Sequence, residues 1–241
     1  MSNAWGVVER SGRASELHAT WPESERAPGQ RLVAVCRVTS PAVILGSTQS
    51  EDVVDSQRAR AAGIAVARRR SGGGAVLVAP ENPVWIDVWL PAGDPLWAHD
   101  VGHAFDWLGE SWADALAACG ISDVSPHRGG FVACTRWSSL VCFGGVGSGE
   151  VLTGDGRKVV GLSQRRTRLG AWFHTACMLH WDPTTLLGIL DLSAPEREAA
   201  SLALARTVVG VQDLLLESGS PVVDGATVGD ALIASLPRLD D

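Results

Sequence analysis

Three consecutive glycines stand between two β-rich runs, and they constrain the local backbone more than any other feature of the chain. Gly72, Gly73 and Gly74 follow Ser71 and lead into an apolar run that begins at Ala75. A backbone without Cβ atoms can lie against a ligand and offer its N–H groups directly. Each glycine also costs conformational entropy on folding. A ligand-binding loop is therefore one interpretation, and a flexible turn with a basic face is the alternative.

Positive charge is concentrated in two clusters of a protein that is acidic overall. One cluster occupies residues 68–70, directly before the glycines, and the other lies within residues 157–168. The formal net charge is −7, which argues against nucleic acid as a partner because phosphate neutralisation needs a basic surface. Two basic clusters in an acidic chain instead indicate a local anionic ligand, such as a carboxylate or a phosphate.

The order of the predicted elements favours an α/β or α+β protein with a long helix packed on a sheet. The best helix prediction is 97–119, where apolar residues recur at steps of three and four and Gly120 follows. Helices are also expected over 51–63 and after Trp181, with the last over 224–236. Strands are expected at 31–38, 42–46, 64–68, 75–79, 84–90, 140–143, 150–153, 157–162 and 171–181.

A second motif, Gly-Arg-Lys-Val-Val-Gly-Leu-Ser-Gln-Arg-Arg at residues 156–166, follows a hairpin signal at 154–156. Lys158 begins the predicted strand, where its side chain can project over a binding site. A lysine so placed can hold a carboxylate or phosphate and neutralise the oxygen charge that develops in acyl transfer. A solvated hairpin lysine is the alternative.

The two motifs together resemble those of lipoate–protein ligase A and its octanoyltransferase relatives. Arg-Arg-x-Ser-Gly-Gly-Gly-Ala-Val at 68–76 precedes a long helix and then Gly-Arg-Lys-x-x-Gly-x-x-Gln-x-Arg at 156–166, and the resemblance covers about residues 32–181. It implies an α+β fold of the biotin/lipoate protein ligase type, a mixed sheet flanked by helices. It also implies an acyl-binding site with Lys158 at the reacting carbonyl. Its substrate-binding residues would be Arg69, Ser71, Gly72, Gly73, Gly74, Gly161 and His174.

The expected domain organisation follows from this resemblance. Residues 1–30 are polar with scattered proline and glycine, and they are expected to form an irregular lead-in. Residues 31–190 would form the catalytic domain, and residues 191–241 a helical segment packed on it. No apolar run approaches the roughly 20 residues that span a bilayer, and the N-terminus lacks the pattern of a secretory signal. A cytoplasmic protein with no membrane partner is therefore expected.

Three positions depart from the family pattern. A histidine that usually follows the glycines is replaced by Val78, and the family's His-Gly-Thr reads His174-Thr175-Ala176. Gly-Ser-Ala-Gln has become Gly-Leu-Ser-Gln at 161–164. Each change would reshape the pocket, so a noncatalytic protein that binds lipoate or a carrier domain is an alternative to an enzyme.

Cys142 is the candidate nucleophile. It lies in a Cys-Phe pair 16 residues before Lys158, comparable to the pair that one octanoyltransferase branch uses. Such a thiol could take the acyl group as a thioester and pass it to a lysine amine, and neighbouring cations would favour its thiolate. The alternative is a buried strand cysteine. The other cysteines, at 36, 119, 134 and 177, have weaker claims and no metal-binding spacing.

The predicted activity is transfer of an octanoyl or lipoyl group to a carrier lysine, and a runner-up is an ATP-dependent lipoate ligase. Only 60 residues follow Trp181, which favours a transferase or a ligase whose accessory subunit is separate. The expected partners are a lipoyl carrier domain or a glycine-cleavage H-type protein, with an acyl carrier protein as a possible donor. No tightly bound cofactor is expected, and ATP with magnesium only for the ligase. His99 and His103 stand four residues apart, but no third metal ligand is evident and no metal site is predicted.

Overall fold

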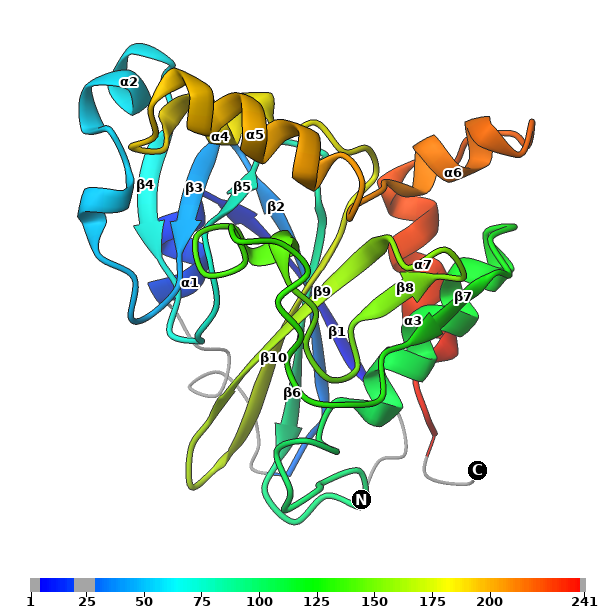
Figure 1. Ribbon diagram of the computed structural model, residues 1–241. Coiled ribbons are helices and arrows are strands. Elements are labelled where there is room, and N and C mark those ends of the chain that lie inside the picture. The colour runs from blue at the N-terminus through cyan, green and yellow to red at the C-terminus, as the bar shows by residue number, and fades with distance from the viewer. Residues whose placement is uncertain (1–4, 20–28, 239–241) are drawn as a thin grey trace.

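The computed structural model describes residues 5–19 and 29–238. These residues form one large and one small β-sheet, with helices packed on both (Figure 1). The large sheet has the strand order β1-β2-β6-β10-β9-β8-β7 and the small sheet the order β4-β3-β5. The bounds of the strands are β1 Gly6–Gly12, β2 Leu32–Val38, β3 Ala42–Leu45, β4 Ala65–Arg68, β5 Val76–Val78, β6 Val84–Pro91, β7 Val124–Pro126, β8 Val151–Thr153, β9 Lys158–Arg166 and β10 Gly170–Cys177.

Both sheets are mixed. In the large sheet β1 pairs with β2 in parallel, whereas β2, β6, β10, β9, β8 and β7 pair in antiparallel fashion. In the small sheet β3 pairs in parallel with β4 and antiparallel with β5. The helices are α1 Ala14–Ala19, α2 Ser56–Ala61, α3 Asp106–Ala118, α4 Thr184–Ile189, α5 Ala194–Leu204, α6 Val211–Glu217 and α7 Gly225–Ser235, with short 3-10 helices η2 Glu51–Val53 and η3 Cys142–Gly144. The mixed sheet with flanking helices confirms the predicted fold class.

The central strand β6 is buried on both faces, and its alternating side chains enter two different cores. Ile86 and Val88 face α3, whose Leu108 and Trp112 are fully buried against the sheet. Trp85 points to the opposite face, where α1 and the small sheet cover the large sheet. The space between the two sheets is where the cavities described below lie.

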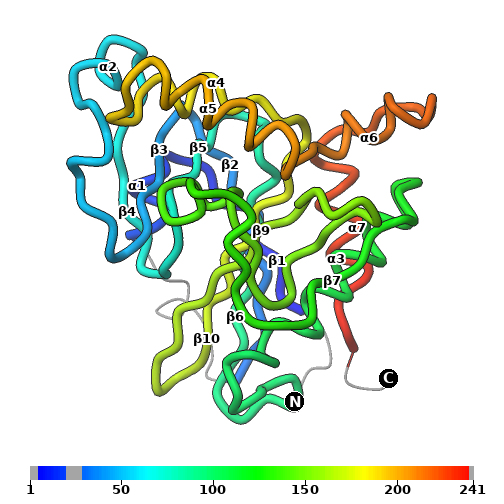
Figure 2. The backbone as a smooth tube through the Cα atoms, in the orientation of Figure 1, coloured from blue at the N-terminus to red at the C-terminus, as the bar shows by residue number. Residues whose placement is uncertain are grey.

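The segment between β7 and β8 links the large sheet to the small one. Figure 2 shows it leaving the large sheet, reaching the small sheet and returning. Val141 forms a single parallel bridge with Ala75, at the end of the glycine run. The strand predicted at 140–143 was wrong, because Cys142–Gly144 is a 3-10 helix. The carbonyl oxygens of Cys142 and Gly145 there accept hydrogen bonds from the side chain of Lys158 and not from a neighbouring strand.

Two further predictions were wrong. The described part of the lead-in is not irregular: β1 lies along β2 as an edge strand, and α1 packs Leu17 against the second face of the sheet. The long helix begins at Asp106 and not at residue 97. Before it, the Asp100 carboxylate accepts a hydrogen bond from the amide of Gly102, a local turn that competes with helical hydrogen bonding. Within the described residues no helix has the length and apolarity to cross a membrane.

The core facing α3 supplies a direct test of the packing. Leu108 has no exposed surface, whereas Leu202 on α5 is 60% exposed. Leu108→Ala would leave a buried cavity and should lower the free energy of unfolding by about 3 kcal/mol. Leu202→Ala would leave none, and it should lower the free energy of unfolding by less than about 0.5 kcal/mol. Urea denaturation measures both, and equal losses for the two variants would contradict this packing.

Candidate active site

Arg69 lies directly before the glycine run, and its guanidinium is buried against that run. The side chain donates hydrogen bonds to the carbonyl oxygens of Ile44 (3.3 Å), Gly72 (2.7 and 3.1 Å) and Gly74 (2.9 Å). Arg69 is only 4% exposed, and no carboxylate among the described residues pairs with it. A buried cation with neutral partners only will favour an anion placed next to it.

The glycines serve this arrangement in different ways. Gly73 has φ of +100°, a conformation that L side chains rarely adopt. A Cβ on Gly74 would lie 2.7 Å from the amide nitrogen of Cys142 and 2.7 Å from the carbonyl carbon of Val141. A Cβ on Gly72 would meet nothing within 4 Å. Gly74 therefore permits the close approach of the chain that carries Cys142, and Gly72 leaves open space.

Cys142 is held against the end of the glycine run. Its amide donates to the carbonyl oxygen of Ala75 (2.9 Å), and the amide of Ala75 donates to that of Leu140 (2.7 Å). The Cys142 thiol sulfur Sγ lies 4.0 Å from Nη2 of Arg69. The structure thus brings the predicted nucleophile and the predicted arginine together, although 72 residues separate them in the sequence.

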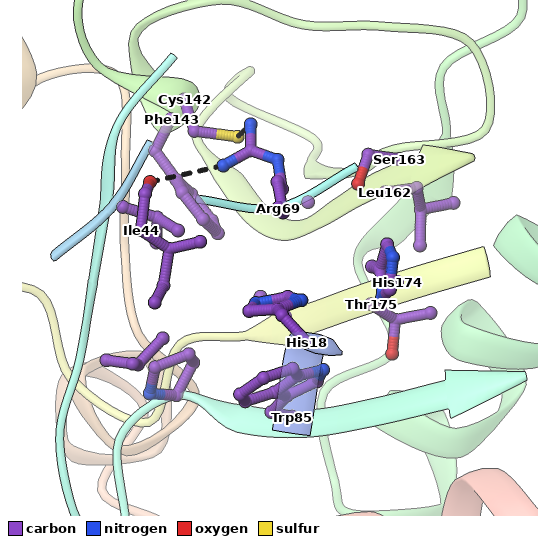
Figure 3. A pocket seen from close by; sticks show the side chains of 15 residues that line it. His18, Ile44, Arg69, Trp85, Cys142, Phe143, Leu162, Ser163, His174 and Thr175 are labelled. Atoms are coloured by element: carbon purple, nitrogen blue, oxygen red, sulfur yellow. Dashed lines mark hydrogen bonds between the residues drawn. The ribbon is translucent and has the colours of Figure 1, made fainter. Parts of the chain in front are cut away.

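Two cavities meet at Cys142. The inner cavity lies between the two sheets and contains about 460 Å³ of space, part of it open to solvent. Figure 3 shows Arg69 and Cys142 at one end of it and His18 and Trp85 at the other. Its walls are mainly apolar, and they are formed by His18, Ile44, Arg69, Val76, Val78, Pro83, Trp85, Cys142, Phe143, Gly161, Leu162, Ser163, His174, Thr175 and Ala176.

The outer cavity lies on the other side of the glycine run and is more polar. It contains about 920 Å³, part of it open to solvent. All three glycines line it, as do Cys142, Leu162 and Ser163, which also line the inner cavity. The remaining lining residues are Thr48, Gln49, Phe131, Ser138, Ser139, Gly145, Gly147 and Glu150. Cys142 can therefore be reached from an apolar pocket and from an open, polar one.

Lys158 is buried and lines neither cavity, so the predicted projection of its side chain over a binding site is not met in this structure. The side chain is 1% exposed, and its ammonium nitrogen Nζ lies 2.6 Å from Oε2 of Glu150. Nζ also donates to the carbonyl oxygens of Cys142 (3.2 Å) and Gly145 (3.0 Å). These three partners use all three ammonium hydrogens. The predicted contact between Lys158 and an acyl carbonyl stays a prediction, and it requires one of these partners to be released.

Glu150 connects Lys158 to two backbone segments that line the outer cavity, those of Gly147 and Leu162. Its Oε2 accepts from the amide of Gly147 (2.7 Å) and its Oε1 from the amide of Leu162 (3.0 Å). Removing one member of such a buried pair leaves an uncompensated charge and is strongly destabilising. The pair therefore fixes the backbone around Cys142 from the side opposite Arg69.

His174 and Asp87 form a polar pair in the wall of the inner cavity. Asp87 Oδ1 lies 2.8 Å from Nδ1 of His174 and accepts from Nε1 of Trp85 at 2.6 Å. Burial alone would raise the pKa of Asp87, but the charge and hydrogen bond of His174 and the charge of His18 together lower it. Asp87 is therefore an ionised carboxylate, which can only accept, so Nδ1 of His174 carries a hydrogen.

His18 reaches the same cavity from α1. Its ring lies 4.5 Å from that of Trp85 and 5.3 Å, edge-on, from that of His174. Burial lowers the pKa of His18 to about 3, and the nearby charges of His174 and Arg69 act in the same direction. The imidazole is therefore neutral at physiological pH.

Of the other predicted site residues, Gly161 lines the inner cavity, and Ser71 contacts Ser163, which lines it. The Ser71 hydroxyl lies 2.9 Å from that of Ser163, which joins the glycine run to β9. Gly161 leaves room for the ring of Phe143, since a Cβ there would approach it to 3.1 Å. Val78, which stands where relatives have a histidine, also lines the cavity.

The remaining candidates lie elsewhere. Burial raises the pKa of the Cys36, Cys119 and Cys177 thiols, so these are poor nucleophiles, and Cys134 lines neither cavity. His99 and His103 precede α3 and do not share a helix face. In the described ranges no three His, Cys, Asp or Glu side chains are placed to hold a metal ion.

Sequence reasoning missed four residues of these walls. Asp87 had a usable signal, since a carboxylate within the apolar run Val-Trp-Ile-Asp-Val-Trp-Leu must find a partner when the strand is buried. Trp85 belongs to the same run. Glu150 carried no comparable signal, because strand residues of this type are ordinarily solvated. His18 carried none because its ring partner Trp85 is 67 residues away in the sequence.

A family comparison agrees with this geometry. The profile of the lipoyl protein ligase A/B catalytic domain matches residues 19–235. The chain belongs to that family. The family match covers both motifs, the helices α2–α7 and all lining residues of both cavities except His18. It confirms the resemblance that the two motifs indicated.

Individual relatives are more distant. The octanoyltransferase LipM of Clostridioides difficile (strain 630) is 26% identical over 164 residues, which are 68% of this chain and 59% of that protein. The chain thus spans well under two thirds of the length of this curated relative.

Solved structures share the fold. A bi-partite lipoate protein ligase from Thermoplasma acidophilum, described with its E2 lipoyl domain, superposes with a TM-score of 0.75 at 21% identity over 98% of this chain and 82% of that one. A lipoate-protein ligase A bound with ATP gives 0.69 at 21% identity, over 98% and 84%. A biotin protein ligase from Leishmania major gives 0.52 at 9% identity, over 98% and 74%. The predicted kinship with the biotin ligase fold is confirmed.

The two glycines with different surroundings give a matched test of the site. In Gly74→Ala the new Cβ meets the backbone that carries Cys142, so this variant should lose about 1–3 kcal/mol of stability and alter the alkylation rate of Cys142. Gly72→Ala places its Cβ in open space and should do neither. Urea denaturation and peptide mapping after iodoacetamide treatment measure both effects, and the same response from the two variants would refute the close approach.

Proposed function

We propose that this protein transfers a medium-chain acyl group, octanoyl or lipoyl, to the lysine of a lipoyl carrier domain through a thioester on Cys142. The observation that carries the proposal is the position of the Cys142 thiol. It lies where an apolar cavity and an open polar cavity meet, 4.0 Å from a buried guanidinium that lacks a carboxylate partner. The apolar cavity suits an acyl chain, and the open one suits the groups that deliver and accept it.

The reaction has two balanced steps. The Cys142 thiolate attacks the carbonyl carbon of a donor thioester, and the donor thiolate leaves and takes up the proton that Cys142 lost. The acceptor amine then attacks the enzyme thioester. The new amide bond forms, the bond to Cys142 breaks, and the amine proton returns to the thiolate.

Arg69 supplies the electrostatic support for both steps. Its guanidinium is buried beside Sγ of Cys142 and is bonded otherwise to carbonyl oxygens, so a negative charge on the sulfur would lie next to a fixed positive one. A tetrahedral intermediate on Cys142 places a second negative charge within its reach. Fixed donors aimed at developing charge in a water-poor site lower the barrier to acyl transfer.

Lys158 and Glu150 position the nucleophile in this proposal. The ammonium group of Lys158 donates hydrogen bonds to the carbonyl oxygens of Cys142 and Gly145, and these bonds fix the position of the 3-10 helix that begins at Cys142. Release of Glu150 by an incoming anionic group would free Lys158 to contact the acyl carbonyl, as its place in the family motif implies.

The relatives support the substrate classes. The curated relative is an octanoyltransferase, and the solved relatives include a lipoate ligase with its E2 lipoyl domain. The acceptor would be a lipoyl domain or an H-type protein, and an acyl carrier protein would be the donor. The described cysteines are all free, as a thiol enzyme of the reducing cytoplasm requires, and we place the protein there.

One observation favours a second candidate, an ATP-dependent ligase. The outer cavity is large and bounded by the Gly72–Gly74 backbone, a surface that suits phosphate groups, and a solved relative is bound with ATP. In that case ATP and magnesium would activate free lipoate, with an accessory subunit supplied separately, and Cys142 would not be acylated.

Mass spectrometry of the acceptor separates these functions. The protein is incubated with octanoyl acyl carrier protein and a lipoyl domain without ATP, and the lipoyl domain should gain one octanoyl group. Cys142→Ala should reduce the rate roughly a thousandfold or more, as loss of a nucleophile does. Cys134→Ala is the matched control, since that cysteine is exposed and lines neither cavity, and it should keep the full rate.

Other outcomes decide between the alternatives. Transfer that requires lipoate, ATP and magnesium and survives in Cys142→Ala would establish the ligase. Binding of the lipoyl domain without any mass gain, under both sets of conditions, would show a noncatalytic relative and defeat the proposed enzyme. Lys158→Ala should abolish transfer, and an unchanged rate in this variant would remove the role assigned to the lysine.

A further inference from the structure

The inner cavity is not apolar throughout. Figure 3 shows His18 and Trp85 at the end away from Cys142, with His174 on the wall between the two ends. Ile44 lies across the cavity from His174 in this view, and the aliphatic side chains of Val76 and Val78 also line the cavity. Two imidazoles therefore face a pocket whose other surfaces suit a hydrocarbon chain.

The hydrogen bonds already formed leave His174 with one free ring nitrogen. Its Nδ1 donates to the ionised Asp87 carboxylate at 2.8 Å. Nε2 forms no hydrogen bond with any residue in 5–19 or 29–238. Asp87 is 3% exposed and holds the ring in one orientation, so the free nitrogen has a fixed position in the wall.

His18 offers both of its ring nitrogens. Its contacts in the described chain are ring contacts with Trp85 and His174, and no hydrogen bond to its imidazole occurs there. The neutral ring keeps one N–H donor and one acceptor. A ligand that reaches this end of the cavity thus meets the N–H donor and the acceptor nitrogen of His18 and the free Nε2 of His174.

A saturated acyl chain would leave these groups without partners. Its methylene and methyl groups would displace water from the imidazole nitrogens and offer no hydrogen bond in return, which weakens binding. A hydroxyl or thiol on the distal carbons would donate to one ring nitrogen, and a hydroxyl would also accept from the N–H of His18.

We propose that the end of the inner cavity formed by His18 and His174 is a hydrogen-bonding subsite that selects acyl groups with a hydroxyl or thiol on their distal carbons. This inference rests on the proposed function, because it takes the inner cavity as the acyl pocket. His18 and His174 act on specificity and not on the transfer steps at Cys142. Asp87 is a positioning residue that orients His174.

The test compares chains of equal length that differ in one terminal group. Isothermal titration calorimetry measures the binding of octanoate, 8-hydroxyoctanoate and 8-mercaptooctanoate to the full chain, and the acyl transfer assay compares the corresponding thioesters. We expect the hydroxylated chain to bind about tenfold or more tightly than octanoate, since sites built around a substrate hydroxyl reject the analogue that lacks it. The mercapto acid shows whether a sulfur-bearing tail is accepted equally well.

Three variants locate the effect. His18→Leu should reverse the preference in favour of octanoate, and His18→Gln, which keeps a donor and an acceptor, should retain part of it. His99→Leu replaces an exposed histidine outside both cavities, and it should bind as the unchanged protein does. Circular dichroism confirms that each variant is folded.

The outcomes separate this inference from the proposed function. Selective binding of the hydroxylated acid without acyl transfer would support the subsite and refute the transferase. Acyl transfer with equal use of both chains, unchanged by His18→Leu, would support the transferase and overturn the subsite, and His18 would then be only an aromatic wall that limits chain length. Failure of every acid to bind, together with no acyl transfer from any of the thioesters, would overturn both.

Discussion

The guanidinium of Arg69 determines how the rest of the site must be arranged. It is buried with carbonyl oxygens of the glycine run as its hydrogen-bond partners and with the Cys142 thiol beside it. Those carbonyls can point inward only because Gly73 adopts a positive φ and Gly74 lies against the chain that carries Cys142. The sequence Arg-Arg-Ser-Gly-Gly-Gly at 69–74 therefore supplies both the buried cation and the backbone that binds it. The backbone carbonyls do not neutralise the charge of the guanidinium, so an anion can bind beside it.

A second buried cation completes the support of Cys142 from the other side. Lys158 lies across the 3-10 helix from Arg69, binds the carbonyl of Cys142 and is neutralised by Glu150. The two cations thus differ in their surroundings: Lys158 is paired with a carboxylate, whereas Arg69 has no carboxylate partner among the described residues and lies beside the Cys142 thiol. Because Glu150 also binds amides on both sides of the outer cavity, a ligand that displaces its carboxylate would change the support of Cys142 as well. In the proposed mechanism, this one side chain would couple binding in the outer cavity to chemistry at the thiol.

Much of the fold and of the reacting end of the site could be predicted from the sequence, because local patterns encode them. The glycine run, the hairpin before Lys158 and the apolar strand β6 are short patterns with direct backbone consequences. The start of α3 was missed because the Asp100 turn overrides an apolar periodicity that continues through it. Lys158 was expected to project over a binding site, and its burial could not be predicted because its partner Glu150 reads as an ordinary strand residue. His18 could not be assigned to the pocket, since only the packing of α1 across the sheet brings it to Trp85. Pairings across the fold, unlike turns and strands, leave no local pattern.

The central claim is that Cys142 carries the acyl group, and the covalent intermediate tests it most directly. The protein is mixed with an octanoyl thioester donor in the absence of any acceptor, digested at low pH and mapped by mass spectrometry. One octanoyl group should be found on the peptide that contains Cys142, it should be released by hydroxylamine, and addition of a lipoyl domain should transfer it to the carrier lysine. An unmodified Cys142 peptide under conditions in which the lipoyl domain is acylated at the full rate would contradict the account.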